Sequence, residues 1–139
     1  MENDEHMSGV HRNALMEARR VQLDAARLGF DWPTVEGPLN KIEEECRELR
    51  SAWSQSEFEC VESELGDLLF SVVNAGRHLN IDPNEALNRA TEKFRRRWMF
   101  VVRQIEESKK EIRELNLHEL DAYWEAAKQV IDSHDEHKG

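Results

Sequence analysis

The stretches KIEEECREL at residues 41–49 and ESELGDLLF at residues 62–70 decide how this chain folds. Each contains two carboxylates three residues apart, which places both on one face of a helix, one turn apart. On a helical wheel each acid pair borders an apolar stripe, in the same sense in both segments. If the two stripes pack together, four carboxylates meet at the edge of the core. The acids are Glu45, Glu48, Glu64 and Asp67, and the stripes are Leu39, Ile42, Cys46, Leu49 and Trp53 in the first segment and Val61, Leu65, Leu68 and Val72 in the second.

A cluster of four carboxylates either raises the pKa values of its members or requires a cation. Oxygen ligands in this number suit Mg²⁺ or Mn²⁺, whereas zinc prefers nitrogen and sulfur. Glu44 lies about 100° from Glu45 on the wheel, farther from the stripe, and we rank it as a weaker ligand. The simpler explanation is a solvated acidic face, because Asp and Glu number 29 among the 139 residues. The matching phase of the two pairs favours the metal site.

The length of the chain predicts one domain, and its formal net charge of −10 argues against a protein that coats nucleic acid or binds a membrane surface. Two cysteines without CxxC spacing predict neither a disulfide framework nor a zinc site. The polar start and the lack of a long apolar run predict no signal peptide and no membrane-spanning helix. We therefore expect a cytoplasmic protein with neither nucleic acid nor a membrane as a partner.

Helical periodicity recurs along the chain and no segment alternates as a strand would, so we expect an all-α bundle of about five helices. A single domain is expected over 12–132, between a disordered tail at 1–11 and a polar tail at 133–139. Gly29 is predicted to cap the first helix, and Asp82-Pro83 to begin the fourth. The predicted helices cover 12–28, 38–53, 57–79, 83 to beyond Lys110 with an interruption at Asn116, and 118–131.

The predicted fourth helix carries the densest positive cluster of this acidic chain. Arg89, Lys93 and Arg96 lie within about 60° of one another on the helical wheel, and Arg97 is close by. Taken alone, the cluster is a solubilising face. A polyanionic ligand would nevertheless need such cations together with metal ions, because Lys and Arg bind phosphate oxygens while Mg²⁺ bridges carboxylates and phosphates.

Other motifs are absent or weak. No ExxH motif occurs, which argues against a ferritin-like di-iron bundle, and the P-loop, nucleophile-elbow and Rossmann patterns are missing. His78 falls on the same side of its helix as the second acid pair, but we expect a surface histidine there. Trp32 falls in a loop rather than on a stripe, which leaves a contact with a base or sugar open.

The ordered set of EExxE at 44–48, ExxD at 64–67 and KFRRR at 93–97 resembles the MazG family of all-α nucleoside triphosphate pyrophosphohydrolases. The stretches AARLGFDWPTVEGPLNKIEEE (25–45) and ELDAYWEAAK (119–128) are similar to the carboxyl-terminal, catalytic domain of full-length MazG proteins, which contain two such domains. The resemblance covers most of the chain.

The resemblance implies a metal site, a phosphate site and a helical homodimer or dimer of dimers. We expect the last helix, with Trp124, to contribute to the interface between chains. Relatives often carry Asn where this chain has Thr91, which puts in doubt a sugar or phosphate contact by that side chain. The implied Mg²⁺ ligands are Glu45, Glu48, Glu64 and Asp67, and the implied phosphate contacts are Lys93, Arg96 and Arg97.

The residues and the resemblance together predict an Mg²⁺-dependent enzyme that cleaves a nucleoside or deoxynucleoside triphosphate to a monophosphate and pyrophosphate, with Mn²⁺ as a substitute metal. Glu48 or Glu45 would take the proton from the attacking water. The alternative is a non-catalytic helical interaction protein whose charges form complementary faces. The number of metal ions, the preferred base and sugar, and the choice between damaged nucleotides and ordinary pools stay open.

Overall fold

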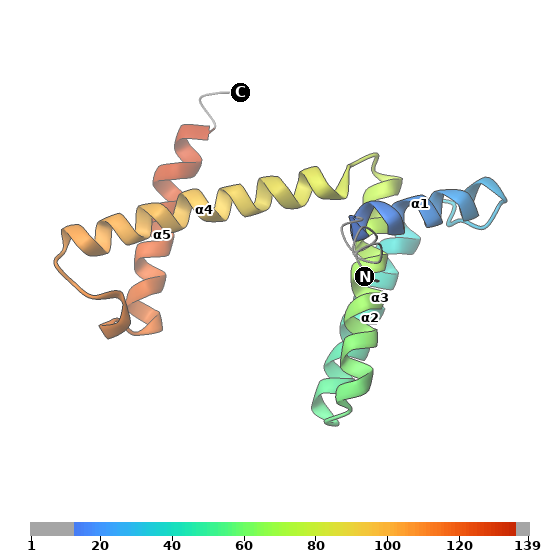
Figure 1. The fold of residues 1–139 in the computed structure, drawn as a ribbon, viewed down its shortest axis with the longest axis horizontal. Coiled ribbons are helices and arrows are strands. Elements are labelled where there is room, and N and C mark those ends of the chain that lie inside the picture. Colours follow the sequence, from blue (N-terminus) through green and yellow to red (C-terminus); the bar gives the residue numbers. More distant parts are fainter. Residues whose placement is uncertain (1–12, 136–139) are drawn as a thin grey trace, which may run out of the picture. The chain divides into compact units, whose positions relative to one another are not determined.

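The computed structural model describes residues 13–135 and is all-α over that range, with no β-strand (Figure 1). The prediction of an all-α fold with about five helices is confirmed. None of the helices in the described range is long and apolar enough to cross a membrane. The elements are α1 (Ala14–Arg27), α2 (Glu36–Ser54), α3 (Phe58–His78), α4 (Pro83–Glu107), the 3₁₀-helix η1 (Ile112–Glu114) and α5 (Leu117–Asp135).

The chain divides into two compact units, residues 1–86 and 87–139. The described part of the first unit contains α1, α2, α3 and the start of α4, and that of the second contains the rest of α4, η1 and α5. The tail predicted at 1–11 lies outside the described residues. Residues 133–135 of the predicted polar tail belong to α5. The single domain over 12–132 stays a prediction.

The core of the first unit is formed where α2 packs along α3, and α1 also contacts α3. The buried residues of α2 recur every seven positions at Pro38, Glu45 and Ala52, which is the spacing of a seam between two helices. The predicted stripe of α2 is therefore wrong in phase, because Cys46 and Trp53 are exposed. Pro38 and Ala52 occupy the two ends of the seam, and Glu45 lies in the helix contact rather than at its border.

The predicted stripe of α3 divides between two faces. Val61 and Leu68 are half-buried, whereas the other two predicted members are exposed. These two belong to a second apolar stripe whose four side chains lie within about 60° of one another on the helical wheel. Their exposed fractions range from 46% to 65%. We call this set the outer stripe of α3, and it consists of Phe58, Leu65, Leu69 and Val72.

The end of α1 sets the direction of the loop that follows it. Gly29 adopts a φ of 95°, a left-handed conformation that favours glycine. Its N–H donates to the carbonyl of Ala26, and the N–H of Phe30 donates to the carbonyl of Ala25. These two bonds form the Schellman motif. The predicted glycine cap is confirmed, and the chain turns directly into an aromatic loop.

Both ends of α4 have a local cause. Asp82 begins the helix, because its Oδ1 accepts hydrogen bonds from two backbone N–H groups of the first turn at 2.8 and 3.2 Å. The predicted continuation beyond Lys110 is wrong. The helix ends at Glu107, since Lys109 adopts a φ of 56° and the N–H of Lys110 donates back to the carbonyl of Ile105.

The core of the second unit joins α4, η1 and α5. Val101, Ile105 and Ala127 are buried there, and partly buried apolar side chains from all three elements pack against them. Asn116, predicted to interrupt a continuing α4, instead begins α5, since its Oδ1 accepts a hydrogen bond from the N–H of Glu119 at 2.8 Å.

Candidate active site

The predicted acids of α2 and α3 meet around one carboxylate. Oxygen atoms of Glu45, Glu64 and Asp67 lie within 4.8 Å of one another, and the same holds for Glu44, Glu45 and Glu48. Glu45 belongs to both groups and is only 3% exposed. The structure therefore brings together all four predicted metal ligands and the weaker candidate. Because the seam of α2 runs through Glu45, packing of the two helices itself assembles the cluster.

Lys41 balances part of the charge at the centre of the cluster. Its Nζ lies 3.1 Å from Glu45 Oε1, one turn away on the same helix, and 3.2 Å from Glu44 Oε1. The bond from Lys41 holds the pKa of Glu45 below its usual range, which outweighs the opposing effect of burial. Sequence reasoning missed Lys41, although its position four residues before Glu45 was a signal for an ion pair across one turn.

The pKa of Glu64 shifts in the opposite direction to that of Glu45. Burial, together with hydrogen bonds to Glu45 and Glu48, raises the pKa of Glu64 to about 7. A protonated Glu64 beside an ionised Glu45 is the arrangement expected when two carboxylates share a site without a cation. The raised pKa of Glu64 is the effect predicted for clustered carboxylates.

The geometry of the donor atoms fits a divalent cation. Oε2 of Glu45 and Oε2 of Glu64 are buried and have no hydrogen-bond partner among the described residues. A buried carboxylate oxygen without a partner is costly, so these atoms are suited to a ligand that supplies positive charge. The set contains only carboxylate oxygens, which Mg²⁺ and Mn²⁺ prefer.

The predicted phosphate-binding cations lie in the second unit, on α4. Lys93, Arg96 and Thr91 are exposed. Arg97 is largely buried, and its Nη2 and Nε donate to the carboxylate of Asp132 at 2.7 and 3.3 Å. The indole of Trp124 lies below the Arg97 guanidinium, 5.8 Å from its carbon, and contacts Phe94.

His78 is not the surface histidine that we expected. Its side chain is 11% exposed, and its Nε2 lies 2.9 Å from Asp31 Oδ1. Arg77 also binds this carboxylate, with Nη2 at 2.6 Å and Nη1 at 3.0 Å. Hydrogen bonds from Arg77 hold the pKa of Asp31 well below its usual range. This network ties the loop after α1 to the end of α3, and no spacing along the chain signals a pair so distant in sequence.

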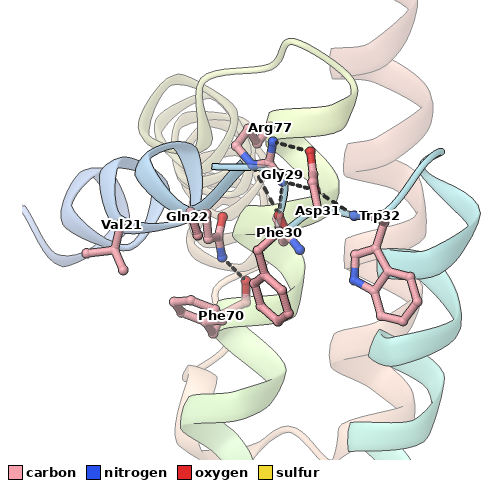
Figure 2. A pocket seen from close by; sticks show the side chains of 10 residues that line it. Val21, Gln22, Gly29, Phe30, Asp31, Trp32, Phe70 and Arg77 are labelled. Atoms are coloured by element: carbon pink, nitrogen blue, oxygen red, sulfur yellow. Dashed lines mark hydrogen bonds and ion pairs between the residues drawn. The ribbon is translucent and has the colours of Figure 1, made fainter. Parts of the chain in front are cut away.

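A cavity of 490 Å³ lies beside this network, within the first unit (Figure 2). Its lining includes Trp32, the loop residue for which a base or sugar contact was left open. The Trp32 indole lies against Gly37, where an added Cβ would approach ring carbons to 2.4 Å. Only glycine therefore leaves room for the ring in its present position. The lining residues are Val21, Gln22, Ala25, Gly29, Phe30, Asp31, Trp32, Phe70, Asn74 and Arg77.

Replacement of Glu64 with Gln tests the electrostatics of the cluster. The raised pKa of Glu64 stabilises the folded protein fully below its ordinary value of 4.5, and this contribution is lost as the pH rises through about 7. We therefore expect the metal-free wild type to unfold at a lower temperature above pH 7 than below pH 5. Glu64→Gln should reduce that difference, as measured by circular dichroism in the presence of a chelator. Glu62→Gln, at an exposed position of the same helix, is the control, and equal pH dependence in the two variants would contradict the prediction.

Residues 34–102 match the model of the MazG nucleotide pyrophosphohydrolase domain. The matched range contains the acid cluster and the three predicted phosphate-binding cations. The matched range begins within the loop after α1 and ends in α4, next to the buried Val101 of the second unit.

Curated relatives extend the similarity over most of the chain. The nucleoside triphosphate pyrophosphohydrolase/pyrophosphatase MazG of Thermotoga maritima is 48% identical over 115 residues, which cover 83% of this chain and 44% of that protein. The nucleoside triphosphate pyrophosphohydrolase of Escherichia coli K12 is 37% identical over 122 residues, which cover 86% of this chain and 46% of that protein. The chain thus spans less than half the length of these two relatives. With the matched domain, these similarities establish that the chain belongs to the MazG family of nucleotide pyrophosphohydrolases.

Proposed function

We propose that the chain is an Mg²⁺-dependent nucleoside triphosphate pyrophosphohydrolase, which cleaves an NTP or dNTP between the α- and β-phosphates and serves in nucleotide-pool housekeeping. The observation that carries the proposal is the Glu45–Glu64 pair, because one buried oxygen of each has no partner within residues 13–135 and suits a cation. Family membership supports the reaction, since both relatives described above carry the name of this activity. Mn²⁺ would serve as a substitute metal.

The surroundings of each carboxylate would decide whether it acts as a metal ligand or as the general base. A bound Mg²⁺ would lower the pKa of a water and neutralise phosphate charge. The ligands would be Glu45, Glu48, Glu64 and Asp67, with Glu44 at the margin. Lys41 holds Glu45 in its ionised form, which suits a ligand and makes it a weak base. This supports exposed Glu48 as the group that takes the proton from the water attacking the α-phosphorus.

The pyrophosphate would be bound by Lys93, Arg96 and Arg97. Lys93 has no ion pair within residues 13–135 and is exposed, so its ammonium is available to a phosphate. Arg97 would have to exchange the carboxylate of Asp132 for a phosphate oxygen, or act while still bound to it. Thr91, two residues before Lys93, and Trp32 are the proposed contacts with the nucleoside.

The charge of the chain supports the remaining proposals on partners. A formal net charge of −10 disfavours nucleic acid and anionic membranes as partners. Cys46 and Cys60 are free thiols at exposed positions, which is compatible with a reducing cytoplasm.

We also propose a homodimer or a dimer of dimers. The outer stripe of α3 supports it, because four large apolar side chains lie exposed in one row. Phe58, Leu65 and Val72 repeat every seven residues, the spacing with which helices of two chains pack. Trp124, expected at an interface, packs against Phe94 and Arg97 of its own chain. The outer stripe is thus the better supported contact surface.

Pyrophosphate release from a panel of normal and modified triphosphates tests the activity itself. With wild type active, Asp67→Asn should lower turnover about 100-fold or more, because the cluster loses a charged ligand. Circular dichroism should show an unchanged helical fold, since Asp67 is exposed. No Mg²⁺ binding by titration calorimetry, with no pyrophosphate released from any triphosphate, would favour the non-catalytic interaction protein. Near wild-type turnover in Asp67→Asn would remove Asp67 from the site.

Lys93→Ala tests the phosphate contact. Loss of a charge-assisted hydrogen bond should raise KM or lower kcat about 10-fold. Lys110→Ala is the matched control, because Lys110 is exposed and lies beyond the end of α4. Similar losses in the two variants, measured by steady-state kinetics, would indicate general electrostatics in place of a specific contact.

Leu69→Glu tests the assembly. A charge in the middle of the outer stripe would be costly to bury, so the molar mass measured by light scattering should fall towards that of one chain. Ser63→Glu adds the same charge at an exposed position of α3 outside the stripe and should leave the mass unchanged. A wild type that is a fully active monomer at micromolar concentration would contradict the proposal.

A further inference from the structure

The cavity of the first unit contains a buried amide that is only half satisfied. Gln22, on α1, is 6% exposed, and its Nε2 donates to the carbonyl of Phe70 at 2.9 Å (Figure 2). This bond fixes which end of the amide is the donor. The other end, Oε1, is buried without a donor among the described residues. Since a buried carbonyl without a donor is costly, a ligand that brings an N–H group into the cavity would complete it.

A second amide in the lining, that of Asn74, has the opposite arrangement, with its acceptor oxygen engaged. Oδ1 of Asn74, on α3, accepts from Nε and Nη2 of Arg77 at 3.2 and 2.7 Å. Asp31 in turn holds the Arg77 guanidinium with two bonds. The acceptor end of Asn74 is thus engaged, whereas Nδ2 has no acceptor within residues 13–135. The lining of the cavity therefore contains one fixed acceptor and one fixed donor.

Aromatic rings line the same cavity. Phe30 is 84% exposed although it lines a hollow, and Trp32 is held in place by its contact with Gly37. Phe70 contributes a third ring. Exposed rings beside a cavity are suited to a flat ligand, because a nucleobase stacks favourably on an aromatic side chain.

The position of the cavity along α3 relates it to the acid cluster. Asn74 follows Asp67 by seven residues, which is nearly two full helical turns, so both lie on one face of the helix. The separation along the axis is about 10 Å. A ribose joins an α-phosphate to its base over a distance of this order.

We propose that the cavity binds the base of the nucleoside triphosphate, with Gln22 Oε1 accepting from an N–H on the base edge and Asn74 Nδ2 donating to an acceptor on it. The proposal rests on the proposed pyrophosphohydrolase activity. Phe30 and Trp32 contact the face of the base. The preferred ligand carries a hydrogen-bond donor and an acceptor on one edge of a flat heterocycle. Gln22 and Asn74 are therefore specificity-determining residues, and neither takes part in the chemical step.

Gln22→Met tests the edge contact at nearly constant volume. We expect KM for the preferred triphosphate to rise about 10-fold with kcat changed much less, and the ratios of kcat/KM among the four bases to converge. Cleavage of inorganic tripolyphosphate, which has no base, should be unaffected. Gln55→Met makes the same substitution at an exposed glutamine, the C-cap residue that follows α2, and should leave the ratios as they are.

Phe30→Ala is a second test that does not depend on correct folding of Gln22→Met. We expect this variant to fold normally, because so exposed a side chain adds little to stability. It should raise KM about 5-fold or more for every nucleoside triphosphate and for none of the base-free substrates. Wild-type KM values and base ratios in both Gln22→Met and Phe30→Ala would overturn the inference while the enzymatic activity stands.

Nucleoside binding separates the two proposals. Adenosine, guanosine, cytidine and uridine are titrated into metal-free protein, and tryptophan fluorescence of wild type is compared with that of Trp32→Phe. Quenching that depends on Trp32 and is lost in Phe30→Ala supports the cavity even if no triphosphate is cleaved. The proposed base site is overturned if no nucleoside quenches the fluorescence. It is also overturned if the quenching disappears as the protein concentration rises, since a second copy of the chain would then occupy the cavity.

Discussion

The carboxylate of Glu45, enclosed between α2 and α3, is the constraint on which the first unit depends. Helix contacts are ordinarily apolar, because a buried charge must be paired or neutralised. Here Lys41 binds one oxygen of Glu45, the other has no partner in the described part of the chain, and the pKa of Glu64 is raised to about 7. An apolar residue would pack there at lower cost. The acid is therefore best explained by a ligand.

The same seam explains the distribution of the remaining acids. Glu45 is buried and Glu64 half-buried, while Glu48 and Asp67 are exposed members of the same cluster. One carboxylate is thus held inside the helix contact, and others retain access to water. This division suits a site where a buried carboxylate binds a cation and a polyanion reaches the cation from the solvent.

Few large side chains are buried in either unit. Among the described residues the buried apolar side chains are three alanines, two valines, one isoleucine and one proline, while many leucines and aromatic residues are exposed. A chain of this length buries a larger core when it folds alone. The outer stripe of α3 and the rings of the aromatic loop are two parts of the exposed apolar surface. The first is suited to a second chain and the second to a flat ligand.

The sequence by itself determined the all-α class, the cap at Gly29, the start of α4 at Asp82 and the four acids, because each depends on spacing within one helix or turn. Only the tertiary structure decided which face of each helix is buried, since small residues and a seven-residue seam outweighed the larger apolar side chains. It also decided the pairing of Asp31 with Arg77 and His78, the engagement of Arg97 by Asp132, and the half-satisfied Gln22. Such contacts join residues far apart in the chain, and local periodicity carries no information about them.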